Sequence, residues 1–183
     1  PSGGFLFGTQ ENLLICRLAG DSITTVTRVE GFDYARITAI QPLGETKDFI
    51  IGTDGNGLFR LNPEGTSPVL ARFAEFPALG SISVRSVVRD SKNNIWITTS
   101  GEGVFRMSFG DDPGLPVSVR RLDINSGLSG NNVLALFEDS GENIWMGFNG
   151  EGLSLLNSDA FEFFAPGGES GSNSIIFIGK LSG

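Results

Sequence analysis

One pattern occurs four times along this chain and limits the possible folds more than any other feature. Its two clearest copies are Asn94–Val104 (NIWITTSGEGV) and Asn143–Leu153 (NIWMGFNGEGL), and looser copies span Asp48–Leu58 and Gly4–Leu13. The equivalent residues Leu6, Ile50, Trp96 and Trp145 are 44, 46 and 49 residues apart. Short β-type runs repeated at such a period and separated by glycine turns are typical of propeller blades. The sequence therefore predicts an all-β propeller of four-stranded antiparallel blades.

Each repeat divides into four short runs of β-branched and aromatic residues, which we expect to be strands. The expected strands are Ile37–Gln41, Phe49–Thr53, Gly57–Asn62 and Val69–Phe73 in the second repeat, Val84–Arg89, Ile95–Thr99, Val104–Ser108 and Val117–Leu122 in the third, and Val133–Phe137, Ile144–Phe148, Leu153–Leu156 and Phe161–Phe164 in the fourth. The first two runs are almost continuously apolar, whereas the fourth alternates. This gradient indicates inner strands covered on both faces and an outer edge strand.

The repeats organise residues 1–183 as a single propeller domain or a propeller segment. Their approximate boundaries are 1–35 plus 174–183, 36–82, 83–131 and 132–173. The chain opens on a second-strand pattern at Phe5, and Ser174–Gly179 has the pattern of a first strand. Two interpretations stay open. The last strand completes the first blade, so that four blades close alone or with another copy, or the chain is an excerpt of a larger propeller. The match of both ends to one turn mildly favours closure.

The composition argues against several classes of function. Thirteen basic and 21 acidic residues give a net charge of -8, which disfavours nucleic-acid and anionic-membrane partners. The chain has no histidine, which removes serine–histidine and cysteine–histidine nucleophiles and histidine metal sites. The only cysteine, Cys16, follows an apolar run and is expected to be a small buried side chain rather than a reactive thiol. No apolar run approaches the roughly 20 residues that span a bilayer, and no cofactor is implied.

Residues that recur at one position of the repeat are expected to build the framework. Trp96 and Trp145 are predicted to lie in the core between blades, although tryptophan also stacks on sugars. Asp90 and Asp139 recur in the turn between first and second strands, where a carboxylate can bond backbone amides. The turn Gly101–Gly103 is followed by a strand and not by a helix, so we interpret it as a hairpin turn and not as a phosphate loop.

The combined motifs resemble the two-component regulator propeller repeat. They are the entry Asn131-Asn132-Val133, the Asp-Ser-Xaa-Xaa-Asn turns, Ile-Trp-Ile or Ile-Trp-Met, and Gly-Glu-Gly followed by Val or Leu. The resemblance covers nearly the whole chain and is weaker in the first two repeats, where Leu6 and Ile50 replace the tryptophan. That family typically forms two seven-bladed propellers in the extracytoplasmic part of hybrid sensor histidine kinases, mostly from gut bacteria that sense glycans.

The resemblance implies a non-catalytic sensory domain that responds to carbohydrate and lies in the periplasm or outside the cell. This chain is much shorter than a family sensor, so sensing would be a property of a longer parent protein. The possible partners are an oligosaccharide, a second copy of the chain, or further blades of that parent.

Ligand-binding residues should depart from the repeat and lie on the face where fourth strands lead into first strands and second strands turn into third strands. The candidates there are Tyr34, Arg36, Asp54, Asn56, Arg85, Glu102, Asn131, Asn149 and Glu151. Tyr34 and Arg36 stand out, because an aromatic ring beside a guanidinium suits a sugar or a carboxylate. The alternative is a solvated loop.

Two other classes of function remain as alternatives. A propeller-type glycoside hydrolase or lyase would need two carboxylates about 5 to 10 Å apart, and the acids outside the repeat are Glu30, Asp33 and Asp123. A purely structural or protein-interaction propeller would instead expose an apolar patch. With no recognisable catalytic motif, we expect a protein that is not an enzyme.

Overall fold

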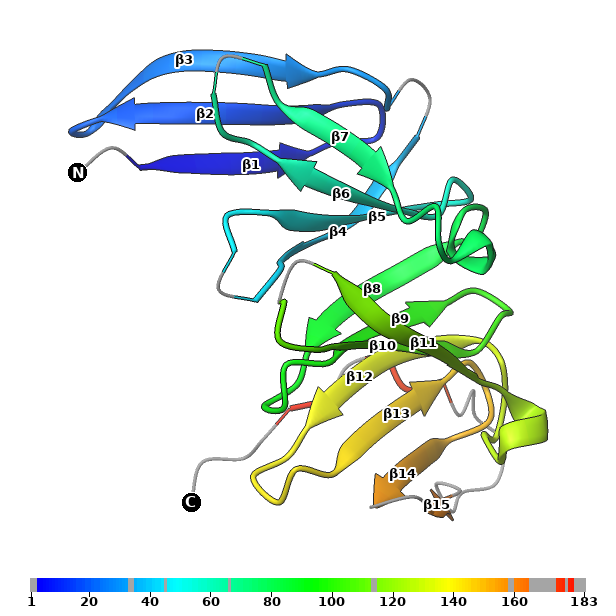
Figure 1. The fold of residues 1–183 in the computed structure, drawn as a ribbon. Coiled ribbons are helices and arrows are strands. Elements are labelled where there is room, and N and C mark those ends of the chain that lie inside the picture. Colours follow the sequence, from blue (N-terminus) through cyan, green and yellow to red (C-terminus); the bar gives the residue numbers. More distant parts are fainter. Residues whose placement is uncertain are drawn as a thin grey trace. The chain divides into compact units, whose positions relative to one another are not determined.

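The computed structural model describes residues 3–32, 35–44, 46–65, 67–112, 115–157, 160–164, 174–176 and 178–179. Within these ranges the chain forms fifteen strands in four antiparallel sheets and two short 3-10 turns (Figure 1). The sheets belong to two compact units, residues 1–84 and 85–183. Each unit is a pair of consecutive blades with a core between them.

The first unit contains a three-stranded and a four-stranded sheet. Sheet one has the order β1 (Gly4–Gly8), β2 (Leu13–Ala19) and β3 (Ser22–Val29), and sheet two the order β4 (Ile37–Pro42), β5 (Phe49–Thr53), β6 (Leu58–Asn62) and β7 (Val69–Arg72). Their facing sides bury one hydrophobic cluster, which includes Leu13 from sheet one, Phe32 from the loop after it, and Ile51 and Leu61 from sheet two. A 3-10 turn, η1 (Pro77–Leu79), follows β7.

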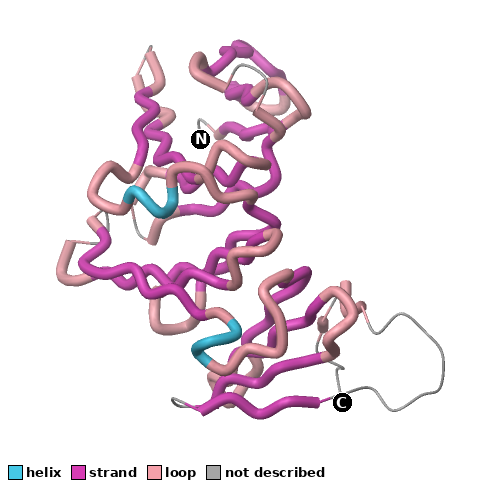
Figure 2. Tube along the Cα trace, turned by 90° about the vertical axis from the view of Figure 1, so that its right-hand side faces the viewer, coloured by secondary structure: helices cyan, strands magenta, loops and turns pink. Residues whose placement is uncertain are grey.

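The second unit pairs two four-stranded sheets in the same way. Sheet three has the order β8 (Val84–Arg89), β9 (Ile95–Thr99), β10 (Val104–Phe109) and β11 (Pro116–Leu122), and sheet four the order β12 (Val133–Glu138), β13 (Ile144–Phe148), β14 (Leu153–Asn157) and β15 (Ala160–Phe164). The turn η2 (Ile124–Ser126) joins β11 to β12, and Figure 2 shows both 3-10 turns as the only described helical segments. Trp96, Val104, Met146 and Phe148 are among the residues buried between these sheets.

The predicted all-β architecture of propeller blades is confirmed, and the expected strands agree with the observed ones to within one or two residues. One difference has a clear cause. The third strand of the second repeat begins at Leu58 instead of Gly57, because Gly57 belongs to the turn, with a φ of +71°. Cys16 is buried, as expected.

The second glycine of the turn between second and third strands is needed for space as well as for conformation. A Cβ atom on Gly103 would lie 2.2 Å from the carbonyl oxygen of Leu122, and one on Gly57 would lie 2.0 Å from that of Leu79. The amide of Gly103 also donates to the carbonyl of Asn131 at 2.9 Å. This glycine therefore lets the turn approach the backbone that leads into the next blade.

The segment at residues 174–176 docks on sheet four as a first strand docks on the sheet before it. The amide of Ile175 donates to the carbonyl of Phe148 at 2.9 Å, just as the amide of Ile37 donates to that of Thr9 at 3.1 Å. A Cβ atom on Gly147 would meet Ile175, and one on Gly8 would meet Ile37. The first strand predicted at Ser174–Gly179 is not observed, since the described residues 174–176 and 178–179 form no strand, but Ile175 packs in the position of a first-strand residue. Its predicted pairing with the strand at Phe5 stays a prediction.

Candidate functional site

The turn between the first and second strands of sheet three is closed by a network that we call the Asp–Asn–Trp clamp. One carboxylate oxygen of Asp90 accepts hydrogen bonds from the backbone amides of Lys92 (3.0 Å) and Asn94 (2.7 Å). The other accepts from the side-chain amide of Asn94 and from the indole N–H of Trp96, both at 2.8 Å. Asp90, Asn94 and Trp96 are all buried. The predicted roles of Asp90 as a structural cap and of Trp96 as a core residue are confirmed.

Sheet four repeats the clamp with Asp139, Asn143 and Trp145. The indole N–H of Trp145 donates to Asp139 at 2.9 Å, and the backbone amides of Gly141 and Asn143 donate at 2.8 and 3.1 Å. These donors, the indole first, lower the pKa of Asp139 to about 2, because they stabilise its ionised form. Trp145 is only half-buried, unlike Trp96.

Five polar residues of the second unit, linked by side-chain and backbone hydrogen bonds, lie in or beside the turns where ligand-binding residues are expected. We call this set the polar row, and it consists of Arg85, Ser100, Asn132, Asn149 and Ser174. The Nε of Arg85 donates to Ser100 Oγ at 2.5 Å, and Ser100 forms an isolated β-bridge with Asn132. The amide of Asn149 donates to the carbonyl of Asn132 at 3.1 Å, and Ser174 Oγ donates to Asn149 Oδ1 at 2.8 Å.

The polar row keeps unused hydrogen-bonding capacity. The side-chain oxygen of Asn132 is buried and has no partner among the described residues. Arg85 is exposed, and the hydrogen bond it makes within the described part of the chain uses Nε, leaving the outer edge of its guanidinium toward solvent. Buried polar atoms normally have partners, so an acceptor like that of Asn132 is a place where an added donor would be favourable.

The candidates in the first unit are largely engaged with one another. Arg36 forms an ion pair with Asp54 at 3.0 Å, and the hydroxyl of Ser83 donates to the same carboxylate. Asn56 is exposed, and its carbonyl accepts from the guanidinium of Arg72 at 2.9 Å. Tyr34 lies outside the described residues, so its stacking beside Arg36 stays a prediction.

The other candidates of the second unit support the turns around the polar row. Glu102 pairs with Arg121 at 2.8 Å, and Asn131 Oδ1 accepts from the amide of Ile124 at 3.0 Å. Glu151 is exposed and lies against Gly130, where a Cβ atom would be 2.9 Å from its carboxyl carbon. These side chains surround the polar row without extending it.

Asp123, one of the acids outside the repeat, has a structural role. Asp123 caps η2, accepting from the amides of Asn125 (2.9 Å) and Ser126 (3.2 Å). Glu30 is exposed and lies in the other unit, and Asp33 is outside the described residues. The described ranges hold no group of three or more side chains suited to a metal ion. None of their helices is long and apolar enough to cross a membrane.

The sequence did not predict a second link between sheets three and four, which joins Ser91 in the turn after β8 to Glu138 at the end of β12. Glu138 accepts from both the amide and the hydroxyl of Ser91, at 2.8 and 2.6 Å. Lys92 pairs with Glu142 at 2.8 Å, and the hydrogen bond and charge of Glu142 raise the pKa of Lys92. Lys92, Glu138 and Glu142 line a polar pocket of about 80 Å³ together with Trp96. Ser91 and Glu138 are 47 residues apart, and neither position signals its partner.

Comparison with known proteins supports the repeat assignment. A family model described as "Two component regulator propeller" matches residues 78–101 and 127–150, so the chain contains two-component regulator propeller repeats in its third and fourth blades. No curated protein matches this chain.

Several solved structures share the fold. The extracellular domain of BT3049 from B. thetaiotaomicron, described as a hybrid two component system, matches with a TM-score of 0.69 and 22% identity over 87% of this chain and 21% of that one. PorZ, an essential surface component of the type-IX secretion system of Porphyromonas gingivalis, matches with a TM-score of 0.51 and 20% identity over 75% and 21%. A chain of the nidogen/laminin complex matches with a TM-score of 0.54 and 13% identity over 87% and 60%. This chain thus spans about a fifth of the two bacterial proteins, and the likeness concerns the fold alone.

Proposed function

We propose that this chain is part of a non-catalytic sensor propeller of a hybrid two-component system, that it lies outside the cytoplasm, and that its polar row binds carbohydrate. The two-component regulator propeller repeats support the sensor assignment. The extracellular location of the BT3049 domain supports the compartment. Sensing itself would belong to a longer parent protein.

The observation that carries the ligand proposal is the unused capacity of the polar row. A sugar hydroxyl both donates and accepts, so it can receive a hydrogen bond from the exposed guanidinium of Arg85 and give one to the hydroxyl oxygen of Ser100 beside it. The exposed side-chain amide of Asn149 adds a further donor nearby. Neutral groups with one cation suit a hydroxyl-rich ligand better than a strongly charged one.

A binding role also agrees with the state of the carboxylates. Asp90 and Asp139 are held in clamps, Asp54 is paired with Arg36, and Glu102 is paired with Arg121. A glycosidase needs one carboxyl with a raised pKa to protonate the leaving group. The donors around Asp139 lower the pKa of its carboxyl instead.

Isothermal titration calorimetry against a panel of neutral and acidic oligosaccharides would test the proposal. Binding of at least one member should weaken about tenfold or more in Arg85→Ala, because a hydrogen bond from a charged donor contributes about 1.5–3 kcal/mol. Arg120→Ala is the matched control, since Arg120 is an exposed arginine on the outer strand β11. Equal affinity of the Arg85→Ala variant and the wild type, or no binding by any oligosaccharide, would contradict the proposal.

A further inference from the structure

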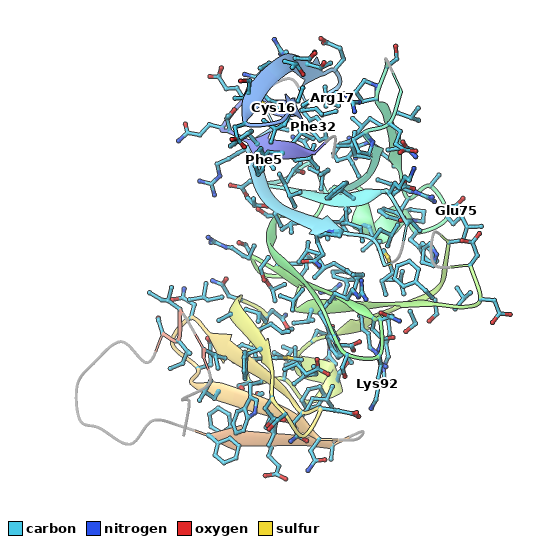
Figure 3. The ribbon with its side chains drawn as sticks, turned by 90° about the vertical axis from the view of Figure 1, so that its left-hand side faces the viewer. Phe5, Cys16, Arg17, Phe32, Glu75 and Lys92 are labelled. Carbon is cyan, nitrogen blue, oxygen red and sulfur yellow. The ribbon has the colours of Figure 1, made fainter. Side chains whose placement is uncertain are left out.

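The polar pocket between sheets three and four contains a cation that the clamps and the polar row do not use. We call it the Arg106 pocket. It has a volume of about 80 Å³, and both sheets that line it belong to the second unit. Its charged lining residues are Asp90, Lys92, Arg106, Glu138 and Glu142, of which Figure 3 labels Lys92. A cavity of this size has room for several water molecules or for one small ligand.

The three carboxylates of the pocket already have partners. Asp90 accepts four hydrogen bonds within its clamp. Glu138 accepts two hydrogen bonds from Ser91. Glu142 forms its ion pair with Lys92 at 2.8 Å. Each negative charge in the pocket is therefore stabilised by a donor other than Arg106.

The guanidinium of Arg106, by contrast, has no counter-ion. Its Nε is buried without a hydrogen-bond partner, and no residue that the structure describes forms an ion pair with it. It lies over the ring of Trp96, 5.4 Å from the ring centroid, and Arg120 is directly opposite it on the neighbouring strand β11. Like charges opposite each other on adjacent strands repel, and a buried N–H without an acceptor is unfavourable. An anion against the guanidinium would reduce both unfavourable effects.

Sheet two shows how the same arginine is neutralised within a blade. Arg60 has the register position on β6 that Arg106 has on β10. The Nε of Arg60 donates to Asp48 at 2.5 Å, and Asp48 directly precedes the second strand of its sheet. In sheet three the residue directly before the second strand is Asn94, a neutral side chain that donates to the clamp. Sheet three therefore keeps the arginine but lacks its counter-ion.

The packing of two blades does not require charged residues at these positions. In the strand registers of the first unit, Ile15 has the position of Arg106, and Pro42 has the position of Glu138. Ile15 is 4% exposed and belongs to the hydrophobic core of that unit. Two consecutive blades thus pack with apolar residues at both positions, and packing alone does not explain the charged pocket of the second unit.

We propose that the Arg106 pocket binds a small monocarboxylate, whose oxygens accept hydrogen bonds from the guanidinium of Arg106. The planar donor fork of an arginine matches the geometry of a carboxylate. The nearby charges of Glu138 and Glu142 repel a second negative charge, so the pocket favours a monoanion over a dianion such as sulfate. Ile144 and Leu156 also line the pocket and suit the short hydrocarbon part of the acid.

A fluorescence titration of the full chain tests the proposal. The chain has two tryptophans, so in a Trp145→Phe background the emission comes from Trp96, which lines the pocket. Sodium acetate and sodium propionate should change this emission in a saturable way, whereas sodium chloride at the same ionic strength should not. Sodium sulfate should bind more weakly than either acid. No saturable response to acetate or propionate, or tighter binding of sulfate, would overturn the proposal.

Variants in the same background assign the binding to Arg106. Arg106→Gln should raise the dissociation constant for acetate at least about tenfold, because it removes the charged donor. Arg106→Ile should do the same, and it places there the residue type that sheet one already buries at this position. Arg121→Gln is the matched control, since Arg121 already pairs with Glu102 at 2.8 Å. Unchanged affinity in both Arg106 variants would refute the assignment, and the titration does not depend on carbohydrate binding.

Discussion

Replacing the second glycine of a Gly-Glu-Gly turn should cost far more stability than replacing the first. Gly101 and Gly103 both have positive φ values, +96° and +78°. An alanine at either position therefore costs about 1–2 kcal/mol for the left-handed conformation. A Cβ atom on Gly101 meets nothing within 4 Å, whereas one on Gly103 lies 2.2 Å from the carbonyl oxygen of Leu122. That overlap involves backbone, which cannot rotate away, and adds about 1–3 kcal/mol of overpacking.

We therefore expect a loss of about 1–2 kcal/mol for Gly101→Ala and about 2–5 kcal/mol for Gly103→Ala. Urea unfolding followed by tryptophan fluorescence measures both, because Trp96 and Trp145 lie in the same unit as the turn. Gly55 and Gly57 form a second matched pair in the first unit, with a Cβ at Gly57 2.0 Å from the carbonyl of Leu79 and nothing near one at Gly55. If the first glycine proves as costly as the second in either pair, the reasoning from close backbone approach is refuted.

Three further predictions concern the clamps and the link between sheets three and four. Since folding lowers the pKa of Asp139 to about 2, its contribution to stability is present above the unfolded-state pKa near 4 and is lost as the pH falls toward 2; acid titration of unfolding should show a shallower decline for Asp139→Asn than for the wild type. Trp96→Phe should cost about 2–4 kcal/mol in urea unfolding and Trp145→Phe distinctly less, because Trp96 is fully packed and its loss leaves a buried carboxylate oxygen short of a donor. Glu138→Ala should lower the free energy of unfolding by about 1–3 kcal/mol. Ser91→Ala should lower it less, because an alanine at position 91 still donates its backbone N–H to Glu138. Equal losses for the two variants would contradict that account.

The strands could be predicted because their signals are local. Ile95–Thr99 and Ile144–Phe148 are apolar runs bounded by turns with Asp, Asn and Gly, and both are strands with the expected limits. The clamp residues could be assigned a structural role because they recur at the same spacing. The hydrogen bond from the indole N–H of Trp96 to Asp90 was not predicted, because it depends on how the strand twists above the turn.

The partners of non-repeating residues could not be predicted. Arg36 and Asp54 were selected as independent ligand candidates, but they neutralise each other across 3.0 Å. The candidate set includes Asn131 but not its neighbour Asn132. It is Asn132 whose side-chain oxygen is buried without a hydrogen-bond partner among the described residues. Asn131 and Asn132 directly precede β12 and have different partners, so a sequence pattern that finds the right turn can still select the wrong one of two asparagines.

Equivalent positions at the ends of the second strands show where one framework permits different chemistry. Asp54, Ser100 and Asn149 all follow a second strand, and each contacts a different kind of side chain: Asp54 pairs with Arg36, Ser100 accepts from Arg85, and Asn149 accepts from Ser174. The backbone hydrogen bonds around them repeat, since Asp54 and Asn149 both donate to the residue before their own first strand. Substitution at these positions therefore changes the surface without changing the blade, which is the property required of a scaffold that presents different ligand-binding groups on a repeated fold.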